Sequence, residues 1–205
     1  MSTYKLVCSN RSRMHGSFVV YQVPPALNNG QLLTLAWLSR PSAPNCRVTF
    51  NWSNSLHFVW GEMGTTLGGG VFDASQCIEA DPYRANMVDL DKDDFGAPMF
   101  QNLRTGGTPG TLTIRQLNNV FDYPVSIGVG VGCKPAYTVD ACANITTTFI
   151  PLVDRYWVVF GNFTQGQTFD VGSVSGSLMV EFDYNAPVQN VVLDMDNMLQ
   201  LVPSR

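Results

Sequence analysis

The sequence predicts an all-β protein: an antiparallel two-sheet β-sandwich of jelly-roll type, with roughly a dozen strands and little helix. Only 14% of the 205 residues are charged, against about 25% in typical globular proteins. Short runs of β-branched and aromatic residues alternate with turn-forming residues at a spacing of about 8 to 15 residues. No window of about eleven residues shows the 3.6-residue period of an amphipathic helix.

An aromatic hairpin is expected between Arg47 and Trp60. Residues 47–51 alternate strictly, with Val48 and Phe50 on one face. A short polar step then leads to residues 56–60, and two strand-like runs so close together favour a hairpin. The other predicted strands are residues 3–8, 17–23, 32–38, 75–80, 86–90, 111–116, 124–132, 144–150, 156–160, 177–182 and 189–193.

Glycine residues are concentrated at two places in the sequence, residues 128–132 and 68–70. Gly128, Gly130 and Gly132 alternate with branched apolar residues, so one face of that strand carries no side chains. We expect a bulky group, an aromatic ring or another sheet, against the bare face. The run at 68–70 predicts a tight turn, because no Lys-Ser/Thr pair follows it as a phosphate-binding loop requires.

The whole chain, residues 1–205, is predicted to form one β-sandwich domain. Single β domains reach about 200 to 250 residues, and we find no linker, repeat or low-complexity tract in the sequence. Without crossover helices between strands, the sheets are expected to be antiparallel.

Charge and hydrophobicity limit the partners. The net charge is −4 and no basic run exceeds two residues, so we expect no nucleic-acid binding. No stretch approaches about 18 apolar residues, which predicts no transmembrane segment. The first residues lack the apolar core of a signal peptide, so a cytoplasmic location is expected.

The five cysteines form no CxxC pair. Their odd number and wide spacing favour reduced, mostly buried thiols. Cys133 and Cys142 flank a short loop and are the pair that could close a disulfide in an exported protein.

No motif for catalysis, a cofactor or a metal is present, and the chain is expected not to be an enzyme. Neither His15 nor His57 stands in a metal-binding spacing, and no GxSxG elbow occurs. By strand alternation, His57 is expected to face solvent, opposite Phe58 and Trp60. An active site assembled from distant residues is the remaining route to catalysis, with Glu62, Asp73, Tyr83 and Arg84 as its candidates.

Alternate aspartates at Asp89, Asp91 and Asp93 raise the question of calcium, which prefers several carboxylate oxygens. The EF-hand pattern fails, because its glycine and distal glutamate are absent at the required offsets. We favour a solvated acidic loop, with calcium binding as the alternative.

Aromatic residues offer the candidate ligand or partner surface. A core position is the favoured interpretation for most of them, since burying aromatic rings stabilises a sheet protein. The alternative is a stacking platform for a ligand. Its members would be Trp37, Trp52, His57, Trp60, Tyr156 and Trp157.

Short sequence motifs rich in aromatic, glycine and amide residues occur along most of the chain: LAW (35–37), Pro41, VTFNW (48–52), FVWGEMG (58–64), FDASQ (72–76), VSIGVG (125–130) and YWVVFGNFTQG (156–166). In these motifs the chain resembles a family of small hypothetical proteins from bacteria and filamentous fungi. The resemblance implies a cytoplasmic β-rich fold. It implies nothing about mechanism: the matching residues are aromatics, glycines and amides, and acid–base pairs are not among them.

Two non-catalytic functions are predicted. The first is a structural or interaction protein that self-associates into a homo-oligomer, because low charge leaves edge strands poorly protected against pairing. The alternative is a lectin-like module that binds a glycan or a lipid headgroup through aromatics and amide-rich loops such as Asn28-Asn29-Gly30. A pore-forming protein is a weaker variant of this alternative, since no long alternating segment demands it.

Overall fold

The computed structural model describes residues 3–25, 32–62, 70–118, 121, 123–183 and 185–203. The loop at 28–30 and most of the glycine run at 68–70 lie outside these ranges. Regular structure in the described ranges consists of strands β1 to β18 and one short 3-10 turn, Val171–Ser173. This confirms the all-β prediction. Within the same ranges, no helix has the length and hydrophobicity needed to span a bilayer.

The strands form four hydrogen-bonded sheets, named A to D here. Sheet A has the order β18 (Leu199–Val202), β17 (Val188–Leu193), β1 (Thr3–Asn10), β5 (Arg47–Ser53). Sheet B has the order β16 (Leu178–Glu181), β14 (Arg155–Gly161), β2 (Gly16–Tyr21), β4 (Leu38–Ser42). Sheet C has the order β15 (Thr168–Phe169), β3 (Leu33–Leu35), β12 (Lys134–Asp140), β11 (Ser126–Val131), β6 (Leu56–Gly61), β7 (Gln76–Ala80). Sheet D has the order β13 (Thr146–Phe149), β10 (Leu112–Gln116), β8 (Met87–Lys92), β9 (Pro98–Arg104).

Two pairings among the described strands are parallel, which corrects the expectation of purely antiparallel sheets. Strand β1 runs parallel to β17, and β8 runs parallel to β10. The expectation assumed that a parallel pair needs a crossover helix, whereas it needs only enough chain to return. In sheet D, β9 provides that return while itself pairing with the far side of β8.

The expected aromatic hairpin is absent, because β5 and β6 belong to different sheets. Strand β5 pairs with β1, and β6 pairs with β11 and β7. Two-residue hairpin loops of the favoured types need positive φ angles, and neither Asn54 nor Ser55 has one. The chain therefore crosses from sheet A to sheet C at this step.

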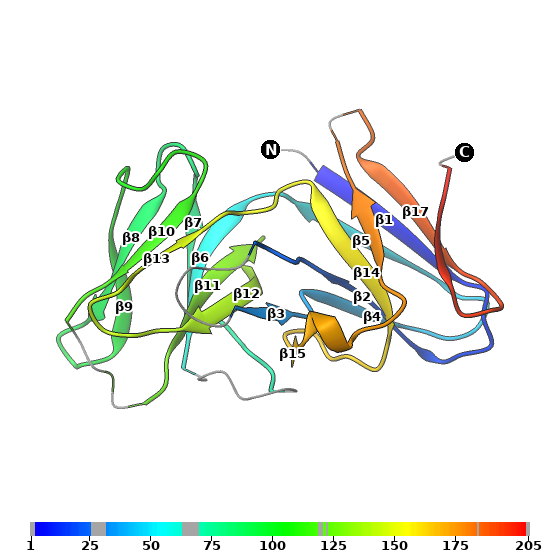
Figure 1. Cartoon of the computed structure of the whole chain (residues 1–205), viewed down its shortest axis with the longest axis horizontal. Helices are drawn as coiled ribbons and strands as arrows, with labels where there is room; N and C mark the ends of the chain where they lie inside the picture. Colours follow the sequence, from blue (N-terminus) through cyan, green and yellow to red (C-terminus); the bar gives the residue numbers. More distant parts are fainter. Residues whose placement is uncertain are drawn as a thin grey trace.

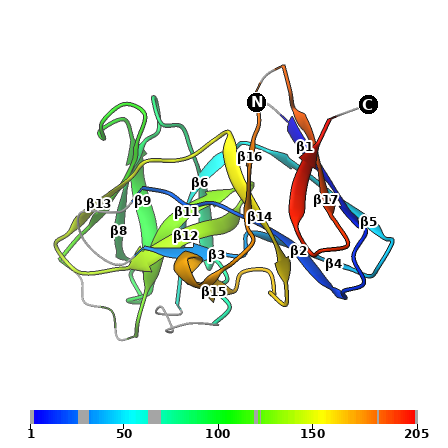
Figure 2. The ribbon, with the colours of Figure 1, turned by 45° about the vertical axis from the view of Figure 1, so that its right-hand side comes forward.

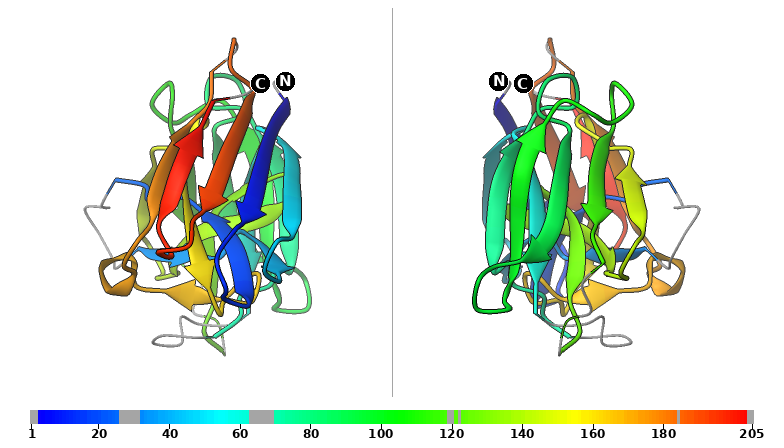
Figure 3. Two further views of the ribbon diagram at one scale, coloured as in Figure 1. Left: turned by 90° about the vertical axis from the view of Figure 1, so that its right-hand side faces the viewer. Right: turned by 90° about the vertical axis from the view of Figure 1, so that its left-hand side faces the viewer.

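The four sheets pack as two face-to-face pairs, where the sequence predicted a single pair (Figure 1). The rings of Tyr4 and Tyr156 lie 6.5 Å apart between sheets A and B, and those of Phe58 and Phe100 lie 6.2 Å apart between sheets C and D. Turning the molecule shows the outer surfaces of sheets A and D (Figures 2 and 3). The main hydrophobic cluster nevertheless draws residues from all four sheets.

Trp37 joins the two halves. It follows β3 of sheet C and precedes β4 of sheet B, and it is fully buried. Its ring stacks on Tyr156 with 5.4 Å between centroids. Its Nε1–H donates to the carbonyl oxygen of Val131, at the end of β11, over 3.1 Å. One side chain thus fixes sheet B against sheet C.

The glycine-rich strand β11 is covered by its own neighbour. A Cβ at Gly128 would collide with the carbonyl oxygen of Tyr137, and one at Gly130 would lie 2.8 Å from that of Lys134. Both oxygens belong to β12, whose register with β11 shifts at Val129/Gly130. The bulky group expected here is therefore the β12 backbone, and not an aromatic ring or another sheet.

Candidate functional site

Most of the predicted aromatic surface lies in the core. The buried residues are Trp37, Trp52, Trp60 and Tyr156, none of them more than 7% exposed. They cannot stack on a ligand in this structure, which supports the core interpretation for them. His57 and Trp157 are partly exposed, and Trp157 stacks against Tyr21 with 6.4 Å between ring centroids. The six residues therefore form no common surface.

The three aspartates considered as calcium ligands, Asp89, Asp91 and Asp93, accept hydrogen bonds from other groups of the protein. Arg115 and Arg104 contact the buried Asp89 carboxylate at 2.8 Å each. Burial raises the pKa of Asp89, but hydrogen bonds from Arg115, Arg104 and Asn102 outweigh it and lower the pKa to about 2. Asp91 accepts a hydrogen bond from Gln101, and Asp93 closes a turn by accepting from the backbone of Phe95 and Ala97. Asp89 and Asp91 lie in strand β8 (Met87–Lys92) and Asp89 is buried, so the expected solvated acidic loop is wrong for these two residues. The contacts favour a structural role over a calcium site.

The residues considered for a scattered active site do not converge. Asp73 lies beside one cavity and Tyr83 beside another. Glu62 and Arg84 are exposed. Asp73 Oδ1 accepts a hydrogen bond from the backbone of the next residue, Ala74.

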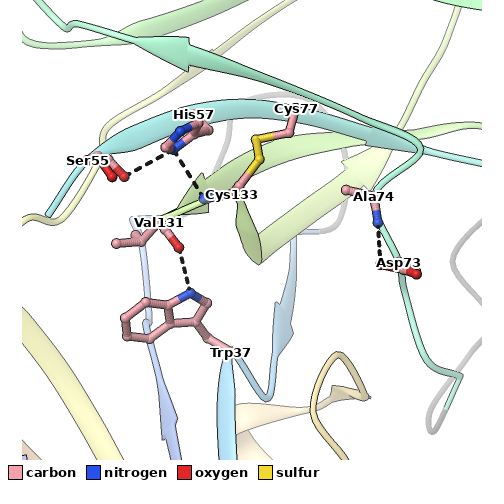
Figure 4. The surroundings of a disulfide bond; sticks show 8 residues. All are labelled: Trp37, Ser55, His57, Asp73, Ala74, Cys77, Val131 and Cys133. Atoms are coloured by element: carbon pink, nitrogen blue, oxygen red, sulfur yellow. Dashed lines mark hydrogen bonds between the residues drawn. A yellow bond between two sulfur atoms is a disulfide. The ribbon is translucent and has the colours of Figure 1, made fainter. Parts of the chain in front are cut away.

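A disulfide joins Cys77 of β7 to Cys133 (Figure 4). It corrects both the expectation of reduced thiols and the suggestion that Cys133 would pair with Cys142 if a disulfide formed. Sheet C explains this choice, because β6 lies between β7 and β11 and brings Cys77 toward the turn after β11. Of the remaining cysteines, Cys8 is buried, whereas Cys46 and Cys142 are exposed. Burial raises the pKa of the Cys8 thiol, which keeps it protonated.

The turn that carries Cys133 is short and left-handed. Gly132 and Cys133 both have positive φ, 59° and 63°, as a two-residue turn between β11 and β12 requires. Cysteine rarely adopts this conformation. The turn is tied to β6 because Gly132 N–H donates to the carbonyl oxygen of Ser55 over 2.9 Å.

His57 lies beside the disulfide. It stands on the face of β6 opposite Phe58, as strand alternation predicted, and its side chain is partly exposed. Nδ1 lies 3.2 Å from the carbonyl oxygen of Ser55 and 3.3 Å from the backbone nitrogen of Cys133. One ring nitrogen and the sulfur atoms of Cys77 and Cys133 all lie within 4.8 Å of one another.

A cavity of about 280 Å³ adjoins Cys133. Trp37 and Phe72 give it apolar walls, while Asp73 and Lys134 supply opposite charges. A small polar molecule would meet both an acidic and a basic group here.

A larger groove of about 600 Å³ lies where β6 begins and β7 ends, and we call it the Tyr83 groove. Tyr83 is 71% exposed beside it, with Leu103 and Val153 as further exposed apolar residues. Glu79 and Asp81 add acidic groups. Its volume falls within the roughly 300–1,000 Å³ of small-molecule sites.

Strand β18 forms an open edge of sheet A. Within the described ranges it pairs with β17 alone, and it lies near β16, the edge strand of the facing sheet B (Figure 3, left). The strand carries no charged residue, and Leu201 is 47% exposed. Met198 and Met195, just before it, are 55% and 57% exposed.

Comparison with known proteins places the chain in a family. A model of the RhiA family matches residues 1–204. The chain belongs to the RhiA family. Protein RhiA of Rhizobium leguminosarum bv. viciae is 28% identical over 207 residues, which cover 98% of this chain and 87% of that protein. No solved structure matches the chain.

The bacterial part of the expected resemblance is thereby confirmed. Sequence reasoning missed the His57–Cys77–Cys133 cluster of this RhiA-family protein, because 56 residues separate the two cysteines. One local signal was available. Gly132-Cys133, between two runs of strand-forming residues, has the glycine that left-handed hairpin turns favour.

Proposed function

We propose that this RhiA-family chain is a non-catalytic interaction protein that self-associates through the open edge of β18. The observation that carries the proposal is an edge strand with no charged residue and an exposed Leu201. Natural edge strands are commonly protected by lysines, prolines, bulges or a covering segment. A strand without charges is suited to pairing with another chain.

A second copy is the partner we favour. Two β18 strands related by a two-fold axis would pair antiparallel, so each would meet the same surface of the other. The neighbouring edge of β16 carries Met179, which is 43% exposed. Met195 and Met198 would add flexible apolar contacts at the end of the strand.

Sedimentation velocity over a concentration series tests this proposal. The unaltered chain should shift toward the mass of a dimer as concentration rises, and Leu201→Lys should remain monomeric. Leu103→Lys is the matched control, since Leu103 is exposed to a similar 41% but lies beside the Tyr83 groove. A monomer at every concentration, or equal loss of the dimer in both variants, would refute the proposal.

The second candidate is lectin-like binding of a glycan or lipid headgroup, favoured by the Tyr83 groove. An exposed tyrosine ring beside acidic acceptors suits the apolar face and hydroxyl groups of a sugar. Glu79 and Asp81 would repel an anionic headgroup. A glycan array should therefore give signals that Tyr83→Ala abolishes, while liposome flotation stays negative. A blank array together with blank flotation would reject this candidate.

We also propose a cytoplasmic location. Cellular reductants in that compartment would hold Cys77 and Cys133 as thiols. Fractionation followed by thiol labelling in the presence of a metal chelator tests this: the chain should be found in the cytoplasmic fraction with both cysteines reduced and open to an alkylating reagent. A disulfide-bonded chain in another fraction would contradict it.

A further inference from the structure

We propose that the reduced chain binds a zinc ion through His57, Cys77 and Cys133. The three side chains come from β6, β7 and the turn after β11. Their donor atoms lie within 4.8 Å of one another. This site is separate from the β18 edge, so its success or failure does not depend on the proposed self-association.

The donor set fits zinc. Thiolate sulfur and imidazole nitrogen are the ligands of structural and catalytic zinc sites. With Zn–S near 2.3 Å and Zn–N near 2.0 Å, tetrahedral ligands lie about 3.5 to 3.8 Å apart. The histidine nitrogen already lies within 4.8 Å of both sulfur atoms. The larger movement is that of the two sulfur atoms, which must separate to about 3.8 Å once their bond is broken.

Reduction of the Cys77–Cys133 disulfide provides the two sulfur ligands. A dithiol reductant breaks the Cys77–Cys133 bond and gives each sulfur one electron and one proton, while the reductant itself becomes a disulfide. Zinc then displaces the two thiol protons, because thiolate is the form that binds a metal. Disulfide and zinc site are thus alternative states of the same two cysteines.

The backbone orients His57 for this role. Nδ1 lies 3.2 Å from the carbonyl oxygen of Ser55 and 3.3 Å from the backbone N–H of Cys133, so the tautomer decides which of these two hydrogen bonds it makes. In the tautomer that donates from Nδ1 to Ser55, Nε2 keeps a free lone pair for a metal. Metal-bound histidines commonly donate their second ring N–H to a backbone carbonyl in this way. The same Ser55 oxygen accepts from Gly132 N–H, so one group positions both the histidine and the cysteine turn.

The cluster is open to solvent on the side of the Cys133 turn. Cys133 is exposed, whereas His57 and Cys77 are partly buried, so an ion can enter from solvent. Three protein ligands leave one tetrahedral position for water or another small ligand.

Cobalt spectroscopy of the reduced full-length chain tests the site. The chain is reduced with a phosphine and freed of metal by a chelator, and Co²⁺ is then added as a spectroscopic substitute for zinc. We expect one equivalent to produce a sulfur-to-cobalt charge-transfer band that zinc abolishes. Cys77→Ser and Cys133→Ser should each weaken the band, and the double variant should lack it.

Variants separate this site from general metal binding. His57→Ala should weaken cobalt binding by at least about tenfold, the lower end of losses seen even for indirect partners of metals. Cys46→Ser and Cys142→Ser are matched controls, because these exposed cysteines lie outside the cluster, and both should bind as the unaltered chain does.

Two results would overturn the proposal: no charge-transfer band in the reduced chain, or a band that survives loss of both Cys77 and Cys133. Circular dichroism of the same samples covers the case of unfolding on reduction. Recovery of the β-sheet spectrum on adding zinc would support the site, and a chain that stays unfolded with zinc would refute it.

Discussion

Arg115 donates two parallel hydrogen bonds to the carboxylate of Asp89, from Nε to Oδ1 over 2.9 Å and from Nη2 to Oδ2 over 2.8 Å. Arg104 adds a third over 2.8 Å, from the other side of β8. The carboxylate is almost fully buried, whereas the two arginines stay 34% and 47% exposed. This cluster connects the three strands β9, β8 and β10 of sheet D.

Asp89→Asn should therefore destabilise the protein by about 1–3 kcal/mol, the usual cost of losing hydrogen bonds to charged groups. The exposed arginines can regain water, which limits the loss. Urea unfolding at neutral pH measures the change, and Asp94→Asn in the exposed β8–β9 turn serves as control. Equal stabilities of the two variants would show that the cluster contributes nothing.

The same cluster predicts an acid transition. Because the pKa of folded Asp89 is about 2 and an unfolded aspartate titrates near 3.9, the folded chain binds fewer protons than the unfolded chain between these values. Its stabilisation is complete above about pH 4 and is lost as pH falls toward 2. The difference in unfolding free energy between the unaltered chain and Asp89→Asn should shrink over this window.

Calcium should leave the protein unchanged. Asp89, Asp91 and Asp93 already accept hydrogen bonds from arginine, glutamine and backbone donors. Millimolar calcium should give no heat in calorimetry and no shift of the melting temperature. A saturable heat signal lost in Asp91→Asn would show that an ion displaces these partners.

Trp37→Ala should cost about 3–5 kcal/mol, as is typical for removing a buried tryptophan. The variant loses the stacking on Tyr156 and leaves the Val131 carbonyl without its indole donor. Trp157→Ala is the comparison, since Trp157 is only partly buried and should cost less. The order of the two melting temperatures checks the assignment of Trp37 to the core.

Gly128 and Gly132 should respond differently to alanine. A Cβ at Gly128 meets the β12 backbone, so we expect a loss of about 3 kcal/mol from overpacking. A Cβ at Gly132 meets open space, and its cost is only the positive φ of 59°, about 1–2 kcal/mol. Equal losses in chemical unfolding would contradict the close approach of β12.

The Cys77–Cys133 bond closes a loop of 56 residues. Chain-entropy arguments give about 4 kcal/mol for such a loop, and measured values usually reach about 2–4 kcal/mol. Cys77→Ser should lose this amount under oxidising conditions, measured by urea unfolding in metal-free buffer. Cys142→Ser should not. With reductant present, Cys77→Ser and the unaltered chain should have similar stability.

Local periodicity predicted many strands and missed others. Strands β1, β8 and β14 begin within a residue or two of their expected starts. Strand β12 was missed because Pro135 interrupts the pattern of strand-forming residues. The short strands β15 and β18 were missed because two to four residues are too few to show alternation.

Which strands pair with one another was harder to predict from the sequence than where the strands lie. The short polar step between β5 and β6 predicts a hairpin from its length alone, although it lacks the glycine of the favoured turns, and the two strands lie in different sheets. The candidate zinc ligands likewise come together through strand pairing, which the sequence does not reveal. Only the order β11-β6-β7 within sheet C brings His57, Cys77 and Cys133 together.

Amide hydrogen exchange of residues 198–202 tests the central claim, self-association through β18, most directly. At high protein concentration these amides should exchange more slowly than in dilute solution, because a second copy covers the open edge. Leu201→Lys should remove the difference, while residues of β9 in the same samples serve as reference. Identical exchange of residues 198–202 at both concentrations would contradict the claim.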